Sequence, residues 1–404
     1  MQRAVPLYPG HAQPRQPHAD IGYYDPRNIE TLETQTKIAK THGIHGFCFY
    51  HYWFNGKLLL EKPVENFLQA GRPDMPFCLC WANEPWTRAW DGRDRHVLMP
   101  QHYGGEQEWS DHFNYLLPAF TDPRAIRVDG RPVFLIYRIG SVTRAKDMIL
   151  TWRRLAEQAG LPGLHIVAML SVFSDSSDFK GVGIDATCEF FPTYATRPRG
   201  LDYLWGAFKL GLHLRVLKRY TPLARRSIVQ VDYDYLWRRI LSARKVFPTQ
   251  YPGTFVSWDN TPRKGHKGFI MKNATPDRYR VWLERQLQRT QADTDQAPLV
   301  FVNAWNEWAE GAYLEPDQTY GYGFLEATRS ALGDLKRLLE PPSDLETLGL
   351  SCDPQIRQCR AAADDAGVIL RAGSVLQTPS TRATVKRQDN SQGGLGQRGR
   401  STAR

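Results

Sequence analysis

Short apolar runs alternate with longer amphipathic stretches along most of this chain. Seven runs are rich in β-branched and aromatic residues and predict strands at residues 47–52, 77–81, 133–137, 166–170, 186–191, 254–258 and 299–304. Apolar spacings of three and four predict helices at residues 28–42, 64–70, 106–120, 145–159 and 276–290. Strands that alternate with helices predict parallel βα units.

Aromatic, amide and carboxylate residues gather where four of the predicted strands end. Functional residues at the carboxyl ends of several strands are typical of a (β/α)8 TIM-type barrel. Such a barrel has eight strands, and the pattern supplies one fewer. Residues 1–20 contain four prolines and no strand signal, so we expect an extended N-terminal segment there.

Composition and charge exclude some classes of protein. Six cysteines suggest no disulfide framework, and Cys48, Cys78, Cys80 and Cys188 lie inside apolar runs, so we expect buried thiols and neither a metal nor a cofactor. The chain has no signal-peptide pattern and no apolar run of membrane-spanning length, which predicts a cytoplasmic protein. No nucleic-acid-binding motif accompanies its basic charge.

The positive charge is concentrated in one insertion. Residues 193–250 hold twelve Lys or Arg against three Asp, a net +9 of the total +10. The stretch 204–226 is basic and apolar, and two interpretations stay open: a helix on the inner face of an anionic membrane, or a solvated helix packed on the barrel. Residues 346–404 turn to Ser, Gln, Gly, Arg and Thr, which predicts a disordered tail.

Four blocks carry a specific resemblance: YHYWFNGK (50–57), CWANEPWTRAWDG (80–92), SWDNTPR (257–263) and NAWNEWAEGAYLEPD (303–317). They resemble the WbsX-like glycan-biosynthesis proteins, which are related to glycoside hydrolase family 99. The resemblance implies a barrel over residues 21–345, a polysaccharide or oligosaccharide substrate and a role in bacterial O-antigen synthesis. The family opens with a strand before the stretch that matches Pro6, so the resemblance also implies that the first barrel strand is missing and leaves an edge exposed.

The resemblance also assigns candidate catalytic residues. By position in the family 99 motif, Glu307 would be the base toward a sugar 2-hydroxyl and Glu310 the acid, although Ala309 stands where that family has His. Their i,i+3 spacing places both on one face of a helical turn. In the alternative, Glu84 of an Asn-Glu-Pro motif would pair with Glu307. A transferase that uses an activated sugar donor and a barrel that binds sugar without turnover also stay open.

Substrate contacts are expected from aromatic and amide residues near these carboxylates, because aromatic rings stack on sugar C–H faces and amides bond hydroxyls. The candidates are Tyr52, Trp53, Trp81, Asn83, Trp86, Trp258, Asp259, Asn303, Trp305, Asn306 and Tyr320. His51 fits a buried core position as well as a ligand contact.

Overall fold

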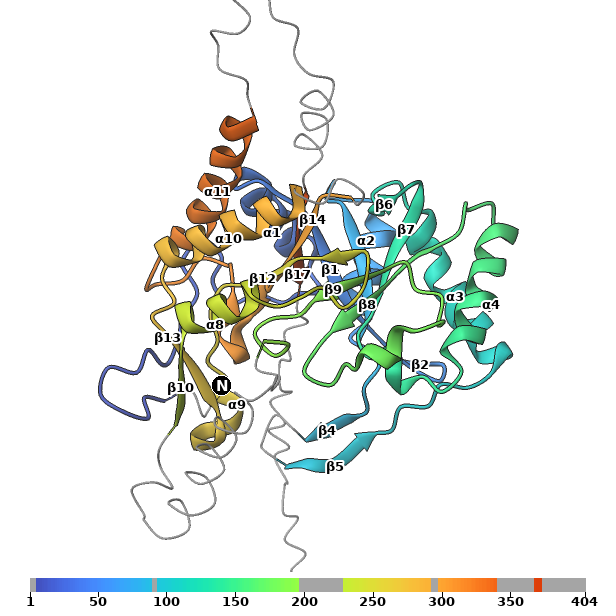
Figure 1. Cartoon of the computed structure of the whole chain (residues 1–404), viewed down its shortest axis with the longest axis horizontal. Helices are drawn as coiled ribbons and strands as arrows, with labels where there is room; N and C mark the ends of the chain where they lie inside the picture. Colours follow the sequence, from blue (N-terminus) through green and yellow to red (C-terminus); the bar gives the residue numbers. More distant parts are fainter. Residues whose placement is uncertain (1–4, 89–92, 196–227, 292–296, 340–366, 373–404) are drawn as a thin grey trace, which may run out of the picture.

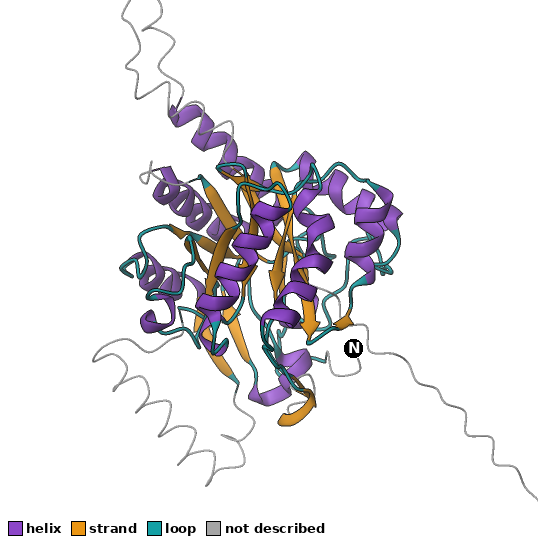
Figure 2. Ribbon diagram, turned by 90° about the vertical axis from the view of Figure 1, so that its right-hand side faces the viewer, coloured by secondary structure: helices purple, strands orange, loops and turns teal. Residues whose placement is uncertain are grey.

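The computed structural model describes residues 5–88, 93–195, 228–291, 297–339 and 367–372. Its centre is a parallel sheet that carries helices on its outer side (Figures 1 and 2). The order of strands in the sheet is β11-β9-β8-β7-β3-β1-β17-β14-β12. Their bounds are Ile44–Phe54 (β1), Phe77–Trp81 (β3), Arg131–Ile136 (β7), His165–Leu170 (β8), Ala186–Glu189 (β9), Gln250–Tyr251 (β11), Gly253–Phe255 (β12), Leu299–Asn303 (β14) and Gly367–Ala372 (β17). All seven predicted strands are confirmed as members of this sheet.

Five helices match the predicted ranges: Ile29–Thr41 (α1), Lys62–Ala70 (α2), Glu106–Thr121 (α3), Ala145–Gln158 (α4) and Pro276–Gln291 (α10). Three more lie outside the predicted ranges: Tyr233–Leu241 (α8), Thr261–Lys264 (α9) and Gly323–Leu339 (α11). A glycine in the left-handed region follows α2, Gly71 at φ 64°, where any other residue would be strained. The helix α8 lies in the basic insertion, whereas the expected membrane segment 204–226 falls outside the described residues.

Short strands pair away from the main sheet or at its border. β2 (Lys57–Leu59) pairs with β1, and β6 (Arg127–Val128) pairs with β7. Three separate pairs are β4 with β5 (Trp86–Arg88, Arg93–Met99), β10 with β13 (Val229–Asp232, Phe269–Lys272) and β15 with β16 (Asn306–Glu307, Ala312–Tyr313). The pairs β4–β5 and β10–β13 lie with α9 at the lower end of the molecule in Figure 1.

The strand β17 corrects two expectations. It lies parallel between β1 and β14, with Val368 opposite both Ile44 and Val300. The border expected to be exposed by a missing first strand is therefore paired. Residues 367–372 form a strand, contrary to the expectation of a wholly disordered tail, and the rest of 346–404 lies outside the described residues.

Two apolar layers arise because alternate residues of a strand face opposite sides. In β1, Phe47 and Phe49 belong to the layer between the sheet and its helices, whereas Cys48 and Tyr50 belong to a second cluster on the other face. This second cluster contains all four cysteines of the predicted strands, and they are buried thiols as expected. Burial raises the pKa of the Cys78 and Cys188 thiols.

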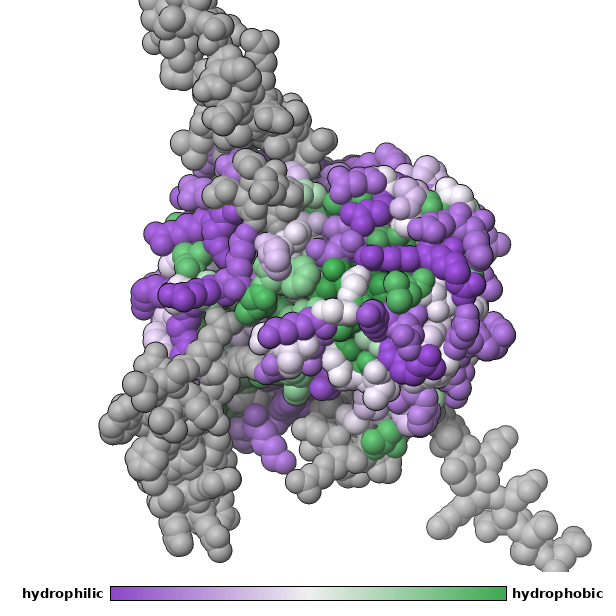
Figure 3. All heavy atoms as spheres, turned by 45° about the vertical axis from the view of Figure 1, so that its right-hand side comes forward, coloured by the Kyte–Doolittle hydropathy of each residue, from purple (hydrophilic) through white to green (hydrophobic). Residues whose placement is uncertain are grey.

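The visible face in Figure 3 is largely hydrophilic, with hydrophobic atoms gathered near its middle.

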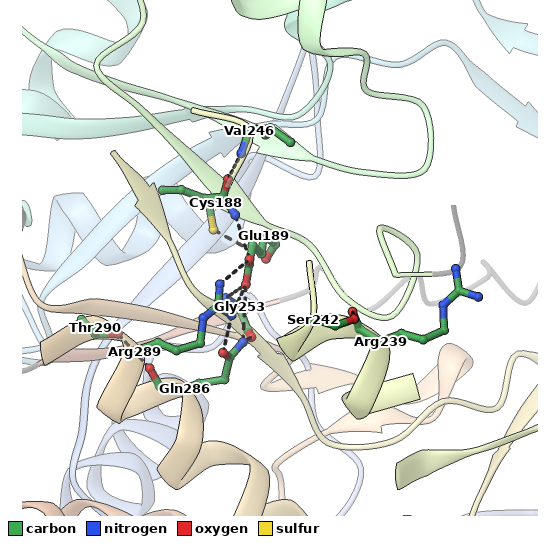
Figure 4. A network of polar contacts seen from close by, with 10 residues as sticks. Cys188, Glu189, Arg239, Ser242, Val246, Gly253, Gln286, Arg289 and Thr290 are labelled. Atoms are coloured by element: carbon green, nitrogen blue, oxygen red, sulfur yellow. Dashed lines mark hydrogen bonds and ion pairs between the residues drawn. The ribbon is translucent and has the colours of Figure 1, made fainter. Parts of the chain in front are cut away.

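A buried carboxylate holds together the region where the strand pairing changes. β11 pairs with β9 and β12 pairs with β14, and only Pro252 separates β11 from β12. Glu189 accepts hydrogen bonds from Gln250 Nε2 at 2.8 Å, from the Gly253 amide at 3.1 Å and from Arg289 Nη2 of α10 at 3.1 Å (Figure 4). A Cβ on Gly253 would lie 2.0 Å from the Glu189 carbonyl oxygen, so only glycine fits there.

We expect Glu189→Ala to lower the free energy of unfolding by about 3–5 kcal/mol, because it leaves buried donors and the Arg289 guanidinium without their acceptor. Urea unfolding followed by circular dichroism measures the change. The matched control is Glu284→Gln, which removes the partly exposed pair with Arg280 and is expected to cost about 1 kcal/mol or less. Equal losses in the two variants would contradict the role of Glu189.

Candidate active site

Loops from four strands converge at the carboxyl ends of the sheet, as the parallel arrangement requires. Tyr52 comes from β1, Trp86 follows β3, Arg263 belongs to α9 after β12, and Glu307 and Glu310 follow β14. The rings of Tyr52 and Trp86 meet edge to face with centroids 5.4 Å apart. The Tyr52 phenol also lies close enough to Arg263 to interact with it electrostatically. These five residues form the candidate site.

One guanidinium bridges the two candidate catalytic carboxylates. Arg263 Nη2 lies 2.6 Å from Glu307 Oε1, and Arg263 Nη1 lies 2.9 Å from Glu310 Oε1. The three side chains are between 11% and 23% exposed. Burial alone would lower the pKa of Arg263, but Glu307 and Glu310 outweigh it and hold that pKa above its ordinary value. Arg263 is not among the candidates expected from the sequence, although it ends the block at 257–263.

A tight turn points both glutamates toward α9. Glu307 ends β15, and residues Trp308–Glu310 form a single 3-10 turn that Gly311 closes at φ 63°. The Asp259 amide donates to the Glu310 carbonyl at 2.6 Å, and a Cβ on Gly311 would lie 2.9 Å from that amide nitrogen. The predicted pairing of Glu307 and Glu310 on one side of the turn is therefore present in the structure.

Asp259, which is 1% exposed, stabilises the loop next to the two glutamates. Its carboxylate accepts from Thr261 Oγ1 at 2.6 Å and Gln13 Nε2 at 2.9 Å, and lies 2.8 Å from His11 Nε2. Burial would raise the pKa of Asp259, but the hydrogen bonds from Thr261, Gln13 and His11 outweigh it and lower that pKa. Its acceptors are used within the protein, so Asp259 ties the N-terminal segment to the loop instead of facing a substrate.

Four of the tryptophans expected at the site lie in the core. Trp53, Trp81, Trp258 and Trp305 are each 5% exposed or less, so their rings are not accessible to a sugar. Trp53 stacks on His112 with ring centroids 4.7 Å apart. These tryptophans pack in the layer beneath the helices, whereas Tyr52 packs against the cluster on the opposite face.

The three asparagines connect loops. Asn83 Nδ2 donates to the Arg138 carbonyl at 2.9 Å, and the Arg138 amide donates to Asn83 Oδ1 at 2.7 Å. Asn303 Nδ2 donates to a main-chain carbonyl of the loop after β9 at 2.7 Å, and Asn306 Nδ2 donates to Tyr24 Oη at 3.0 Å. All three asparagines are buried, which indicates positioning of the strand ends.

The remaining sequence candidates lie at the rim or in the core. Glu84 pairs with Arg138 at 2.8 Å, so it has a different arginine from Glu307. Tyr320 is 39% exposed. His51 is buried with its Nε2 2.9 Å from His112 Nε2, and burial lowers the pKa of His51 to about 3, so it is a neutral core residue.

A third carboxylate of the segment after β14 is fully enclosed. Glu315 accepts from Trp308 Nε1 at 2.5 Å, from Gln35 Nε2 at 2.7 Å and from Tyr24 Oη at 2.8 Å. Burial outweighs these bonds and raises the pKa of Glu315 to about 7. Trp308 stacks on Tyr313 with centroids 3.8 Å apart, so Glu315 fixes the orientation of the indole between the two candidate glutamates.

Asp232 and Asp234 stabilise the start of α8 and its contact with α10. Asp232 accepts from the Tyr235 amide at 2.9 Å at the start of α8, and Asp234 pairs with Arg278 at 3.0 Å. Within the described ranges, no group of three or more His, Cys, Asp or Glu side chains is placed to hold a metal. The same residues contain no helix that is both long and apolar enough to span a bilayer.

A cavity of about 1110 Å³ lies at the opposite end of the sheet, near the first residues of β8 and β14. Arg131 and Asp185, which line it, pair with each other at 2.8 Å. The cavity contains none of the convergent carboxylates described above, so its size alone does not make it the candidate active site.

The comparison with protein families defines the class. Residues 1–328 match the family described as Glycosyltransferase WbsX, so the chain belongs to this family of carbohydrate-active enzymes. The resemblance seen in the four sequence blocks is confirmed.

Two relatives named "Uncharacterized protein WxcX", from Xanthomonas campestris pv. campestris strains B100 and ATCC 33913, are each 37% identical over 340 residues. The alignment covers 82% of this chain and 45% of each relative, so the chain spans about half the length of the curated relatives it matches.

Two solved structures align with most of this chain at low identity. A "Glycoside hydrolase-like protein" is 15% identical with a TM-score of 0.49, over 78% of this chain and 89% of that one. A GH99 endo-alpha-mannosidase from Bacteroides thetaiotaomicron is 14% identical with a TM-score of 0.45, over 82% of this chain and 91% of that one.

The buried Glu315 predicts a pH-dependent stability. Its pKa is about 7 in the folded state against an ordinary 4.5, so the unfolded chain loses this proton first as pH rises. The folded state therefore loses about 3 kcal/mol of relative stability between pH 4.5 and pH 7. Glu315→Gln cannot titrate, so we expect this decline to be absent from its urea-unfolding free energies. Parallel pH curves for parent and variant would contradict it.

Proposed function

We propose that this protein acts on a glycosidic bond of a bacterial surface polysaccharide through Glu307 and Glu310. The observation that supports this most directly is the single guanidinium that contacts both carboxylates at the carboxyl ends of the strands. The membership in the WbsX family supports a carbohydrate substrate. The role in O-antigen synthesis, the cytoplasmic location and the membrane contact through 204–226 remain proposals from the sequence.

The two glutamates have different tasks in the proposed reaction. A general base must be ionised, and a general acid must carry the proton that it gives to the leaving oxygen. A neighbouring arginine favours ionised carboxylates. We therefore assign Glu307 as the base that keeps its 2.6 Å contact with Arg263, while Glu310 releases the guanidinium when it takes up a proton.

The proposed site requires strand ends that face one another. We propose that the sheet closes into an eight-position barrel, with β11 and β12 as the two halves of one strand. The pairings of β11 with β9 and of β12 with β14, across Pro252 alone, support this closure. The Glu189 carboxylate also joins β11 to β12 there, because it accepts hydrogen bonds from Gln250 and from Gly253.

Transfer to a second sugar is the favoured outcome over hydrolysis for one reason. The family is described as a family of glycosyltransferases, and the chain belongs to it. The same carboxylates would serve both outcomes, because acid and base duties are needed whether water or a sugar hydroxyl is the acceptor.

We expect Glu310→Gln to lower kcat by about 10²–10⁴ while the affinity for the glycan changes little, because the amide cannot donate the acid proton. Rates are measured against α-mannosides and bacterial O-antigen oligosaccharides, and affinity by isothermal titration. Exposed Glu326 supplies the control variant Glu326→Gln, which should match the parent. Full activity in both Glu307→Gln and Glu310→Gln would reject the assignment.

Arg263→Gln tests the bridge between the glutamates. Without the positive guanidinium beside them, protonation of Glu307 and Glu310 becomes more favourable. We expect the alkaline limb of the pH–rate profile to move to higher pH and the optimum rate to fall. The control is Lys264→Gln on the exposed neighbour in α9, and an unchanged profile in Arg263→Gln would contradict the bridge.

A further inference from the structure

We infer that Phe173, Arg138 and Glu84 form a second sugar-binding subsite, which takes another residue of the oligosaccharide bound at the glutamate pair. This inference rests on the proposed function, and it assigns the residues that would hold a further sugar of the polysaccharide. The three residues follow β8, β7 and β3, which are neighbours in the sheet and end at the same border as the candidate site.

Phe173 presents an accessible aromatic ring. Phe173 is 58% exposed, and the Arg138 guanidinium carbon lies 4.4 Å from the ring centroid. The arginine steadies one side of the ring and leaves the rest in solvent. An aromatic π-face is negative and attracts positively polarised hydrogens, which the C–H face of a pyranose supplies.

The loop that carries this ring is internally bonded. The Phe173 amide donates to Ser171 Oγ at 3.3 Å, and the Ser171 amide donates to Ser174 Oγ at 2.9 Å. Ser174 Oγ in turn donates to the Met169 carbonyl at 3.1 Å. Both serines are buried, so the ring stands on an ordered turn, and little conformational entropy is lost when a ligand binds.

Arg138 and Glu84 add polar groups beside the ring. Their ion pair is 2.8 Å long, and the two side chains are 31% and 35% exposed. Asn83 fixes the Arg138 main chain through two hydrogen bonds. The pair offers several N–H donors and carboxylate acceptors to solvent, which suits the donor and acceptor character of adjacent sugar hydroxyls.

A pocket borders the loop that carries Phe173. Its volume is about 620 Å³, within the range of ligand sites, and its lining includes Ser174 and Asp175, which follow Phe173 in the chain, and Arg239 of α8. Toward the glutamates, Trp86 stands two residues after Glu84, contacts Tyr52 and is partly exposed. The segment after β3 therefore carries Glu84 of the proposed subsite and Trp86 of the candidate active site.

The test measures binding against the length of the glycan. Isothermal titration is carried out with linear manno-oligosaccharides and sized O-antigen oligosaccharides of about two to six sugars. We expect Phe173→Ala to weaken binding of the longest oligosaccharides about tenfold and to leave disaccharide binding unchanged. Phe173→Tyr should restore the affinity. Tyr235→Ala removes another exposed aromatic, on α8, and is the control without effect.

The outcomes separate this inference from the proposed catalytic pair. Equal affinities of parent and Phe173→Ala for every length, or no binding by the parent, overturn the subsite. Length-dependent loss in Phe173→Ala supports the subsite even where Glu307→Gln and Glu310→Gln both retain full turnover, a result that rejects only the catalytic pair. Equal loss for short and long glycans also overturns the subsite, because it places Phe173 at the first sugar.

Discussion

Parallel strands deliver their carboxyl ends to a single border of the sheet, and the site depends on this constraint. Tyr52, Arg263, Glu307 and Glu310 are distant in sequence and meet only because β1, β12 and β14 run in the same direction. The constraint is weakest near Pro252, which has no amide to donate to a neighbouring strand. Glu189 compensates there with side-chain bonds to two strands and a helix.

Each carboxylate of the site has partners within the protein, Arg263 for the two glutamates and the N-terminal segment for Asp259. Two carboxylates so near one another repel, and the shared guanidinium offsets that repulsion at a partly buried position. Behind them, Asp259 is satisfied by the N-terminal segment through His11 and Gln13, and its amide holds the Glu310 turn. The N-terminal segment, which has no helix or strand in its described part (residues 5–20), therefore contributes to the site by fixing a loop.

The sequence predicted the sheet and the glutamate pair because both depend on local spacing. Apolar residues that recur with a period of two identify strands, and those with a period of 3.6 identify helices. The spacing of three residues between Glu307 and Glu310 places their side chains on one side of a turn. The sequence did not predict the burial of Trp53, Trp81, Trp258 and Trp305, because it does not show which face of a strand is covered by other elements. Arg263 was missed because its partners lie on another loop. The short apolar run within 367–372 was the available signal for β17.

The thiol cluster inside the sheet has a practical consequence. Cys48, Cys78, Cys80 and Cys188 are buried, and the raised pKa of Cys78 and Cys188 disfavours the thiolate that reacts with alkylating reagents. Labelling of these sulfurs consequently requires the strands to separate. The rate of labelling in native buffer then reports the free energy of local opening at four defined points, without any introduced probe.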